Sequence, residues 1–407
     1  AWAALRVFEI DGSRDFEFLS RVFTKLLLNF TWWVNRKDSA GKNIFDGGFL
    51  GLDNIGPIDR SAMLPVDARL EQSDGTAWMA TYCLNLLEIA LVLAEHDRAY
   101  EDLATKFFEH FAYIAEAMDS QGLWDEQDGF FYDVLSFADG SRLPMRVRSM
   151  VGLLPLTATT TLGHDTLARL PDFAARFHWF LVNKPRYSGV VGEAHVRDGS
   201  EGRLLSIVDG ARLKRVLSTM LSEDEFLSPY GLRALSRKHR DDPFVIDLGG
   251  STFSVDYEPG ESTTGLFGGN SNWRGPIWFP MNYLLVEAVT RFARFFGDDL
   301  TIEHPTGSGI NVTLASLADD LASRLVSIFL EDADGRRPVF GDVEVFQSDP
   351  YWHDLLTFNE YFHGETGRGL GASHQTGWTG LVADLILRSH LSVGVDDGPR
   401  LSRRGGE

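Results

Sequence analysis

Two carboxylic acids stand in glycine-rich and aromatic loop sequences that are far apart in the chain. Asp53 lies in the stretch 47–56, which reads GGFLGLDNIG, and Glu360 lies in 359–369, which reads NEYFHGETGRG. A carboxylic acid that donates a proton and a carboxylate that accepts one from water could together hydrolyse a bond by general acid–base catalysis. The apolar neighbours Leu52 and Ile55 predict a raised pKa for Asp53, because apolar surroundings disfavour the charged form of a carboxylate.

Each of these acids has a structural alternative. An aspartate in a loop, here beside Asn54, most often caps a turn or a helix, and the residue types alone favour that interpretation of Asp53. Glu360 could be a solvated residue at a helix end, and Glu365 in the same stretch could also present a carboxylate. The residues alone therefore leave open which acids would carry the chemistry.

A third stretch, 269–278, reads GNSNWRGPIW and joins one arginine to two tryptophans. The guanidinium of Arg274 could hold a carboxylate or a hydroxyl through its rigid fork of donors, or it could form a structural ion pair. The rings of Trp273, Trp278 and Trp378 could form flat walls against which sugar rings stack. Core packing is the default for any single tryptophan, but we expect at least one of the three to form such a wall.

Three further residues are candidates for contacts with a substrate. Asp74, in the stretch 71–78, EQSDGTAW, could accept hydrogen bonds from hydroxyls or cap the apolar helix that follows, and the two roles are about equally favoured. Trp124 opens an acidic and aromatic stretch, 124–133, which could line the rim of a pocket or form a structural turn. Phe49 stands in the same glycine-rich stretch as Asp53.

In this order, the three stretches resemble glycoside hydrolase family 63, the family of processing α-glucosidase I and its bacterial relatives. The stretch around Asp53 is similar to the acid-bearing loop of that family, and 272–283 is similar to its Trp-Arg-Gly-Pro signature. The stretch around Glu360, followed by TGW at 376–378, is similar to the loop that carries the base. Each motif is moderately specific by itself, whereas all three in order are highly specific. The resemblance extends from about residue 17 to about residue 390.

The resemblance implies hydrolysis of α-glucosides with inversion, with Asp53 as the general acid and Glu360 as the general base. Alignment on TGRG at 366–369 favours Glu360 over Glu365. In an inverting mechanism the two carboxyl groups stand about 6.5–9.5 Å apart, so that a water molecule fits between them. The implied fold is an (α/α)6 toroid of inner and outer helices.

The chain departs from the family pattern in two ways. The stretch 55–60, IGPIDR, is longer than in the eukaryotic enzymes, so the residues around the sugar can differ. The N-terminal β-rich domain of the relatives is missing and the chain starts as if inside a helix, so we expect a C-terminal portion of a longer protein.

Other functions stay open beside the α-glucosidase. Trehalose, or a mannosyl or glucosyl conjugate of glycerate, is an alternative substrate. A non-catalytic carbohydrate-binding domain is the alternative of a different class. The pair of Asp53 and Glu360 distinguishes the two classes, because a binding domain needs aromatic walls but has no need for two opposed acids.

The spacing of apolar residues predicts the helices that must position these loops. Stripes with steps of three and four residues run through 19–33, 103–118, 284–295 and 314–328. The stretch 77–94 is apolar on nearly every side, which is typical of a fully buried helix. Buried and amphipathic helices in alternation predict an all-α fold with two helical layers, as a single domain over 1–407.

Long loops connect these predicted helices, and we expect them to be functional, because such long loops are otherwise uncommon. Strand-like pieces such as 244–247 predict small β-hairpins inside them. The loops are expected at 40–76, 119–149, 184–207, 226–274 and 331–376.

Composition excludes several classes of function. The chain has 407 residues and a formal net charge of -20, which disfavours nucleic acid and anionic membranes as partners. The single cysteine, Cys83, permits no disulfide within the chain and is expected to be a buried thiol. We expect no apolar run to be long enough for a membrane helix, and no secretory signal opens the sequence, so we predict a cytoplasmic location. No metal, nucleotide or other cofactor motif is found. The family resemblance implies a small carbohydrate, an α-glucoside, as the partner.

Overall fold

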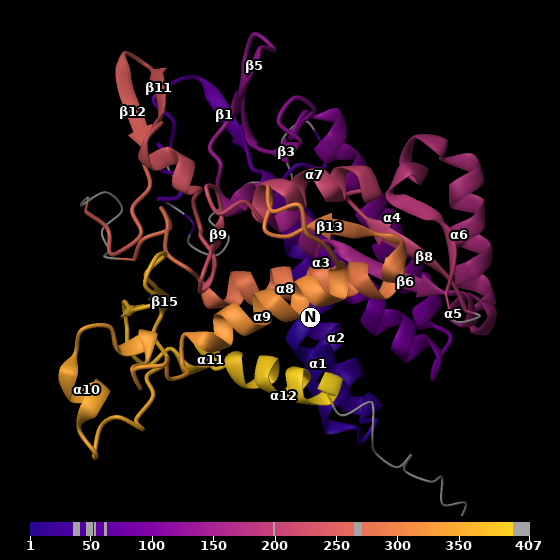
Figure 1. Cartoon of the computed structure of the whole chain (residues 1–407). Helices are drawn as coiled ribbons and strands as arrows, with labels where there is room; N and C mark the ends of the chain where they lie inside the picture. Colours follow the sequence, from indigo (N-terminus) through magenta and orange to yellow (C-terminus); the bar gives the residue numbers. More distant parts are fainter. Residues whose placement is uncertain are drawn as a thin grey trace, which may run out of the picture.

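The computed structural model describes residues 1–35, 41–45, 52, 54–60, 63–197, 200–263 and 271–393 of the chain. Helices form most of its regular structure, and several of the longest lie together in the middle of the molecule (Figure 1). The longer helices are α1 (Trp2–Asp11), α2 (Phe16–Val34), α3 (Ser73–Ala94), α4 (Tyr100–Ser120), α6 (Pro171–Asn183), α7 (Gly210–Met220), α8 (Phe279–Phe296), α9 (Leu314–Ser327) and α12 (Val382–Val393). The short helices are α5 (His164–Arg169), α10 (Glu344–Ser348) and α11 (Thr376–Thr379).

The four predicted apolar stripes each lie on a helix, so these predictions are confirmed. Residues 19–33 belong to α2, 103–118 to α4, 284–295 to α8, and 314–328 to α9 and the residue that follows it. Most of the stripe side chains are buried in the core. Local capping adds to this burial at the start of α2, where Asp15 accepts a hydrogen bond from the Phe18 amide at 2.8 Å.

Helix α3 is the most buried helix of the core, as its apolar sequence predicts. It packs along α4 and also contacts α1, α2 and the short helix η3 (Leu154–Thr157). Its free thiol, Cys83, is fully buried. The expectation that no apolar run could cross a membrane is wrong for α3, which is long and apolar enough by length and composition. However, 78% of its most apolar window is buried inside the protein, as in the core helix of a soluble fold.

Small antiparallel sheets accompany the helices, as the predicted β-hairpins indicate, and they are more extensive than hairpins alone. In the part of the chain that the structure describes there are seven sheets of two or three strands. The three-stranded sheets are β1 (Ala68–Glu71), β4 (Asp133–Phe137) and β5 (Arg142–Met145), and β6 (Thr159–Gly163), β8 (Ser200–Ser206) and β7 (Val191–Arg197), in these orders. The two-stranded sheets pair β2 (Trp124–Asp125) with β3 (Phe130–Phe131), β9 (Leu227–Ser228) with β10 (Gly231–Leu232), β11 (Phe244–Leu248) with β12 (Ser251–Val255), β13 (Thr301–Glu303) with β14 (Asn311–Thr313), and β15 (Tyr361–Phe362) with β16 (Gly369–Leu370).

Strands lie in two ranges that were predicted to be loops, 226–274 and 184–207. The strand predicted at 244–247 is confirmed as part of β11, which forms a hairpin with β12. The range 184–207, predicted as a loop, instead holds most of the β6-β8-β7 sheet. Sheet pairing with the distant strand β6 satisfies the backbone polar groups of this range, and a local sequence pattern cannot show such a partner.

The N-terminal ends of α3 and α8 face the loops that carry the three motifs. The Phe45 amide donates to the Thr76 hydroxyl in the first turns of α3 at 3.1 Å, and the 269–278 stretch leads directly into α8. The short helix η3 packs against both α3 and α8. The two helices are therefore linked through η3, and the chain enters the signature stretch directly before α8.

Candidate active site

The structure describes the residues on either side of Asp53 in the acid stretch. Asp53 and Phe49 lie outside the described residues, so their predicted roles stay predictions. The flanking residues Leu52 and Asn54 are buried, with 1% and 6% of their surface exposed. The backbone on both sides of Asp53 is thus packed into the protein.

Asn54 joins this stretch to the third motif, 217 residues further along the chain. Its Nδ2 donates to the backbone oxygen of Ser271 at 2.9 Å, and its Oδ1 accepts from the amide of Trp273 at 3.0 Å. A side-chain amide that bonds a carbonyl and an amide in this way mimics a strand pairing and fixes both partners. The residue next to Asp53 is therefore attached to the Trp-Arg-Gly-Pro stretch.

Arg274 strengthens the same attachment. Its Nε donates to the backbone oxygen of Asn54 at 2.9 Å and its Nη2 to that of Gly56 at 3.3 Å. Its Nη1 lies 3.8 Å from a carboxylate oxygen of Glu258, and its side chain is only 4% exposed. Of the two predicted roles, the structure gives Arg274 the structural one, since its fork of donors holds the backbone that follows Asp53.

Glu360 lies where the base stretch meets the third motif. Its Oε1 accepts a hydrogen bond from the Ser271 hydroxyl at 3.0 Å, and its Oε2 accepts from the amide of Ala372 at 3.2 Å. Its own amide donates to the Ala372 carbonyl at 2.9 Å. The side chain is half-buried, and within the described residues no arginine or lysine pairs with it. Glu360 is thus a carboxylate held by neutral donors.

Glu365, the local rival, has a different environment. Its carboxylate accepts from the Tyr257 hydroxyl at 2.7 Å and pairs with Arg233 at 3.0 Å and with Arg240 at 3.1 Å. Burial by itself would raise the pKa of Glu365, but the Tyr257 hydrogen bond and the charges of both arginines lower it below its usual value. A carboxylate that is bound on both oxygens by cations and a phenol suits a structural ion pair better than the activation of water.

The carboxylate of Asp74 is bound by an arginine that sequence reasoning missed. The Nη1 of Arg60 donates to Asp74 at 2.9 Å, and the Nε of Arg60 donates to Asp133 on β4 at 3.0 Å. Asp74 is 1% exposed and is not the cap of α3, because that position is taken by Gln72. Asp74 nevertheless binds the start of the helix, because its Oδ1 accepts from the Gly75 amide at 2.8 Å. Its burial beneath Arg60 disfavours a contact with a sugar hydroxyl.

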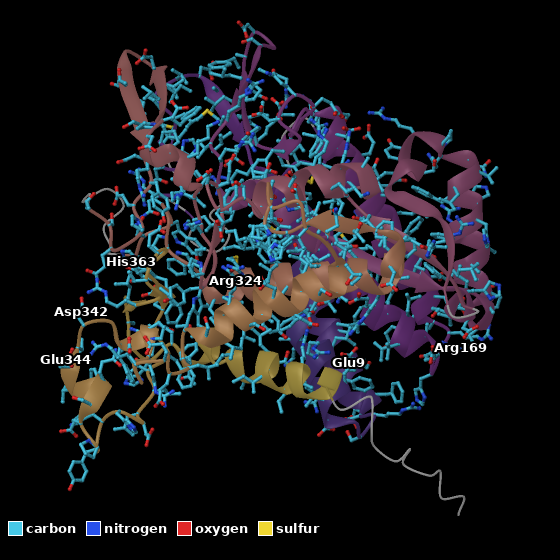
Figure 2. All side chains as sticks on the ribbon, viewed as in Figure 1. Glu9, Arg169, Arg324, Asp342, Glu344 and His363 are labelled. Carbon is cyan, nitrogen blue, oxygen red and sulfur yellow. The ribbon has the colours of Figure 1, made fainter. Side chains whose placement is uncertain are left out.

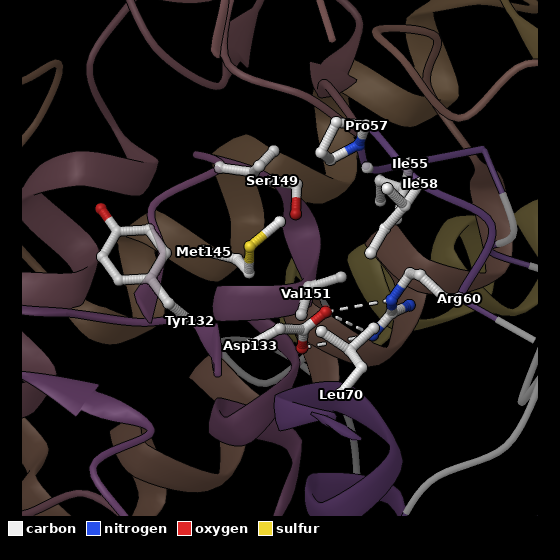
Figure 3. A pocket seen from close by; sticks show the side chains of 12 residues that line it. Ile55, Pro57, Ile58, Arg60, Leu70, Tyr132, Asp133, Met145, Ser149 and Val151 are labelled. Carbon is white, nitrogen blue, oxygen red and sulfur yellow. Dashed lines mark hydrogen bonds and ion pairs between the residues drawn. The ribbon is translucent and has the colours of Figure 1, made fainter. Parts of the chain in front are cut away.

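Burial also acts on the second carboxylate of this cluster. It raises the pKa of Asp133 to about 6, against the opposing charge of Arg60. Figure 3 shows Arg60 and Asp133 beside a small cavity whose wall includes Ile58 and Met145. The cavity measures about 20 Å³, which is room for about one water molecule, so it does not hold a sugar.

The predicted tryptophan walls turn out to be mostly core. Trp273 stacks on Trp278 with ring centres 3.7 Å apart and planes at 6°, and Trp278 stacks on Tyr361 at 4.7 Å. Trp273 and Trp278 are only 3% and 2% exposed, so neither leaves a ring face on which a sugar could stack. Trp378 is half-buried and meets Trp278 edge-on at 6.2 Å, and its stacking role stays a prediction.

Trp124 lies in the β2–β3 hairpin rather than among the motif loops. Its ring packs edge-on against Phe131 at 4.8 Å, and the guanidinium groups of Arg212 and Arg215 lie 4.9 and 5.5 Å from its centre. It is 6% exposed. These described neighbours belong to none of the three motif stretches, which favours the structural-turn interpretation of the 124–133 stretch.

Hydrogen bonds connect the described parts of the three motif stretches. His363, which follows β15 in the base stretch, lies on the opposite side of the view from Glu9 and Arg169 (Figure 2). The bonds of Asn54, Ser271 and Glu360 connect the acid, signature and base stretches in this order. Neither Ser271 nor Asn54 was predicted from the sequence to be functional, although they lie in the motif stretches 269–278 and 47–56.

A comparison with protein families matches part of this chain. Residues 204–379 match the model of the mannosylglycerate hydrolase MGH1-like glycoside hydrolase domain. This range contains the third motif and the base stretch, whereas Asp53 and Asp74 precede it. The matched part of the chain is thus similar to a glycoside hydrolase domain.

Related sequences agree with this class. The chain is 48% identical over 409 residues to the uncharacterized protein YMR196W of Saccharomyces cerevisiae, covering 95% of this chain and 38% of that protein. It is 26% identical over 184 residues to a probable mannosyl-oligosaccharide glucosidase of Schizosaccharomyces pombe, covering 45% of this chain and 16% of that protein. The chain therefore spans less than half the length of these relatives.

Solved structures show a similar fold. A conserved protein from Thermus thermophilus superposes with a TM-score of 0.53 at 16% identity, covering 94% of this chain and 75% of that one. The family 63 mannosylglycerate hydrolase of the same bacterium, in complex with glucose, superposes with a TM-score of 0.52 at 15% identity, covering 94% and 74%. Together with the sequence relatives, these likenesses confirm that the family resembled is glycoside hydrolase family 63.

Proposed function

We propose that this chain hydrolyses an α-linked glycoside with inversion at the anomeric carbon, using Asp53 as the general acid and Glu360 as the general base. The observation that carries the proposal is the contact of Ser271 with both stretches. Its hydroxyl bonds Glu360 at 3.0 Å, and its carbonyl bonds Asn54, the neighbour of Asp53, at 2.9 Å. These two contacts support the proposal that the stretches that carry the two acids form one site.

The proposed reaction requires one proton transfer at each acid. Asp53 donates its proton to the glycosidic oxygen as the bond between this oxygen and the anomeric carbon breaks. Glu360 takes a proton from a water molecule, whose oxygen forms the new bond on the opposite face of the sugar. The products are an alcohol and a sugar of inverted configuration, and exchange with solvent then restores both acids.

We also propose that the helices close into an (α/α)6 toroid and that the chain acts as a single catalytic domain. The alternation of a fully buried helix, α3, with the amphipathic α4 supports two layers. An N-terminal β-rich domain as a partner and a cytoplasmic location are further parts of this proposal. They rest on the family resemblance and on the sequence.

An α-glucoside is the first candidate substrate, because the matched oligosaccharide glucosidases bear that name. A mannosyl or glucosyl conjugate of glycerate is the second, because the matched domain model and the structural neighbour carry the name of a mannosylglycerate hydrolase. The formal net charge of -20 disfavours an anionic substrate at long range. The α-glucoside therefore has priority in the test.

The test follows the anomers of the products by proton NMR. The 407-residue chain is incubated with kojibiose, nigerose, maltose, isomaltose, trehalose, mannosylglycerate and glucosylglycerate. We expect β-glucose to appear first from one α-glucoside, and Asp53→Asn and Glu360→Gln to lower the rate by a factor of about 100 or more.

The other outcomes separate the alternatives. Cleavage of a glycerate conjugate or of trehalose alone would keep the chemistry and change the substrate. Retained activity in either variant would exclude that residue from its proposed role. Binding of sugars without cleavage of any member of the panel would identify a carbohydrate-binding domain instead.

A further inference from the structure

The carboxylate of Glu360 has two described hydrogen-bond donors, and they come from different parts of the chain. The amide of Ala372 belongs to the base stretch itself and bonds Oε2 at 3.2 Å. The hydroxyl of Ser271 belongs to the signature stretch and bonds Oε1 at 3.0 Å. Only the second bond fixes the carboxylate relative to another loop of the site.

Ser271 is at the same time attached to the acid stretch. Its backbone oxygen accepts from Asn54 Nδ2 at 2.9 Å, and the amide of Trp273, two residues later, donates to Asn54 Oδ1 at 3.0 Å. A single residue therefore contacts the carboxylate of the base and the residue next to the acid. No other described hydrogen bond or ion pair connects these two stretches so directly.

The residue that follows Ser271 is rigidly held. Asn272 is fully buried, and its Nδ2 donates to the carbonyls of Glu258 and Gly260, both at 2.8 Å. Its carbonyl accepts from the indole of Trp278 at 2.8 Å. Ser271 is therefore attached to an anchored backbone, so its hydroxyl has a defined position from which to hold Glu360.

We propose that Ser271 is a positioning residue, which holds the carboxylate of Glu360 at a fixed place relative to the stretch that carries Asp53. This inference rests on the proposed function. A glutamate side chain has several rotatable bonds, and a charge-assisted hydrogen bond at one oxygen selects one of its rotamers. In an inverting hydrolase the water must fit between base and sugar, and a misplacement of about 1 Å can lower the rate by about 100-fold.

The variant Ser271→Ala isolates this contact. It removes the hydroxyl that bonds Glu360 and leaves the carbonyl that Asn54 uses, so the attachment of the acid stretch is kept. We expect kcat on the substrate found above to fall by about 10- to 100-fold, with KM changed by less than about twofold, because Ser271 acts on the base rather than on the sugar. Ser271→Thr keeps a hydroxyl and should restore most of the lost kcat.

The matched control is Ser327→Ala on α9. Ser327 is also half-buried, and its hydroxyl also donates a hydrogen bond, to the Arg324 carbonyl at 2.7 Å, but this bond involves none of the three motif stretches. We expect wild-type kcat and KM for this control. Melting temperatures of all variants report whether the fold is intact.

Several results would overturn the inference while the proposed function stands. One is wild-type kcat in Ser271→Ala together with an inactive Glu360→Gln. Another is a raised KM at unchanged kcat, which would make Ser271 a substrate contact. A third is a loss that follows a lowered melting temperature and is not recovered by threonine. Activity in Glu360→Gln, or no cleavage by the wild type, would overturn the proposed function and this inference together.

Discussion

The residue beside the Glu360 carboxylate must be a glycine. Gly371 has a φ of 66°, and a Cβ atom at this position would lie 2.7 Å from Oε2 of Glu360 and 3.0 Å from its Cβ. The left-handed backbone is one reason for a glycine, and the contact with the carboxylate is a second. The left-handed backbone affects stability alone, whereas the contact with the carboxylate also affects the position of the proposed base.

Gly371→Ala should therefore lower activity beyond its effect on stability. We expect kcat to fall by about 10- to 100-fold, because the added methyl group displaces Glu360. Gly335→Ala is the control, since Gly335 has a φ of 74° with nothing within 4 Å of its Cβ position. Gly335→Ala should lose about 1 kcal/mol of unfolding free energy in urea titrations. Gly371→Ala should lose more, because its Cβ would also lie 2.7 Å from the buried ring of Tyr361. At a temperature where both variants are fully folded, only Gly371→Ala should lose kcat. Equal kcat in the two would show that Glu360 tolerates the methyl group.

At this scale the sequence predicted residue types better than contacts. The choice of Glu360 over Glu365 depended on the family resemblance, and the arginine pairs of Glu365 now give it a physical reason. The burial of Trp273 and Trp278 could not be predicted, because an aromatic ring suits a core and a sugar surface equally well. The roles of Asn54 and Ser271 depend on bonds across 217 residues, which no local pattern contains.

At the scale of elements, Arg60 connects the chain that follows the acid stretch to helix α3 and strand β4 through two carboxylates. It follows the acid stretch, and it bonds Asp74 in the first turn of α3 and Asp133 on β4. Asp133 also accepts from the Ser73 amide at 2.8 Å, at the start of α3. The cluster therefore sets the position of the acid stretch against both a helix and a sheet.

The cluster predicts a pH dependence of stability. The pKa of Asp133 is raised to about 6, so between about pH 4 and pH 6 the folded state binds a proton that the unfolded state has lost. Stability from this group is thus greatest at low pH and falls as the pH rises towards 6. We expect Asp133→Asn to remove a decline on the order of 1–2 kcal/mol in urea titrations across this range. Asp298→Asn, at an exposed position, is the matched control, and an unchanged slope in Asp133→Asn would contradict the prediction.

Helices with a strong periodicity of apolar residues could be predicted, whereas strands that pair with distant partners could not. The helices α2, α4, α8 and α9 carry apolar stripes that only a helix can bury on one side. The sheet of β6, β8 and β7 assembles from strands around an intervening pair of helices, so its range was expected to be a loop. The resulting fold is helical with small sheets, one of which joins strands that no predicted hairpin contains.

At the scale of the whole molecule, the first turn of α3 and the cavity beside the N-terminal helix lie at different ends of α3. The motif loops meet the N-terminal ends of α3 and α8. Trp2 of α1 instead lies with Glu88 of α3 and Arg291 of α8 around a cavity of about 290 Å³. Glu88 follows Asp74 by 14 residues on α3, which is about 21 Å along the helix axis.

This separation predicts that stability and catalysis can be changed independently at the α1 end. The indole of Trp2 donates to Glu287 at 3.1 Å and packs edge-on against Tyr283 with ring centres 5.6 Å apart. We expect Trp2→Ala to lower the unfolding free energy by about 1–3 kcal/mol, because it removes a partly buried ring, while kcat and KM stay within about twofold of wild type. Trp2→Phe should keep most of the stability, since it retains a ring and loses only the hydrogen bond. A fall in kcat in Trp2→Ala at a temperature where the protein is fully folded would mean that a packing change at Tyr283, five residues after Trp278, reaches the base, and stability and catalysis would then not be independent at this position.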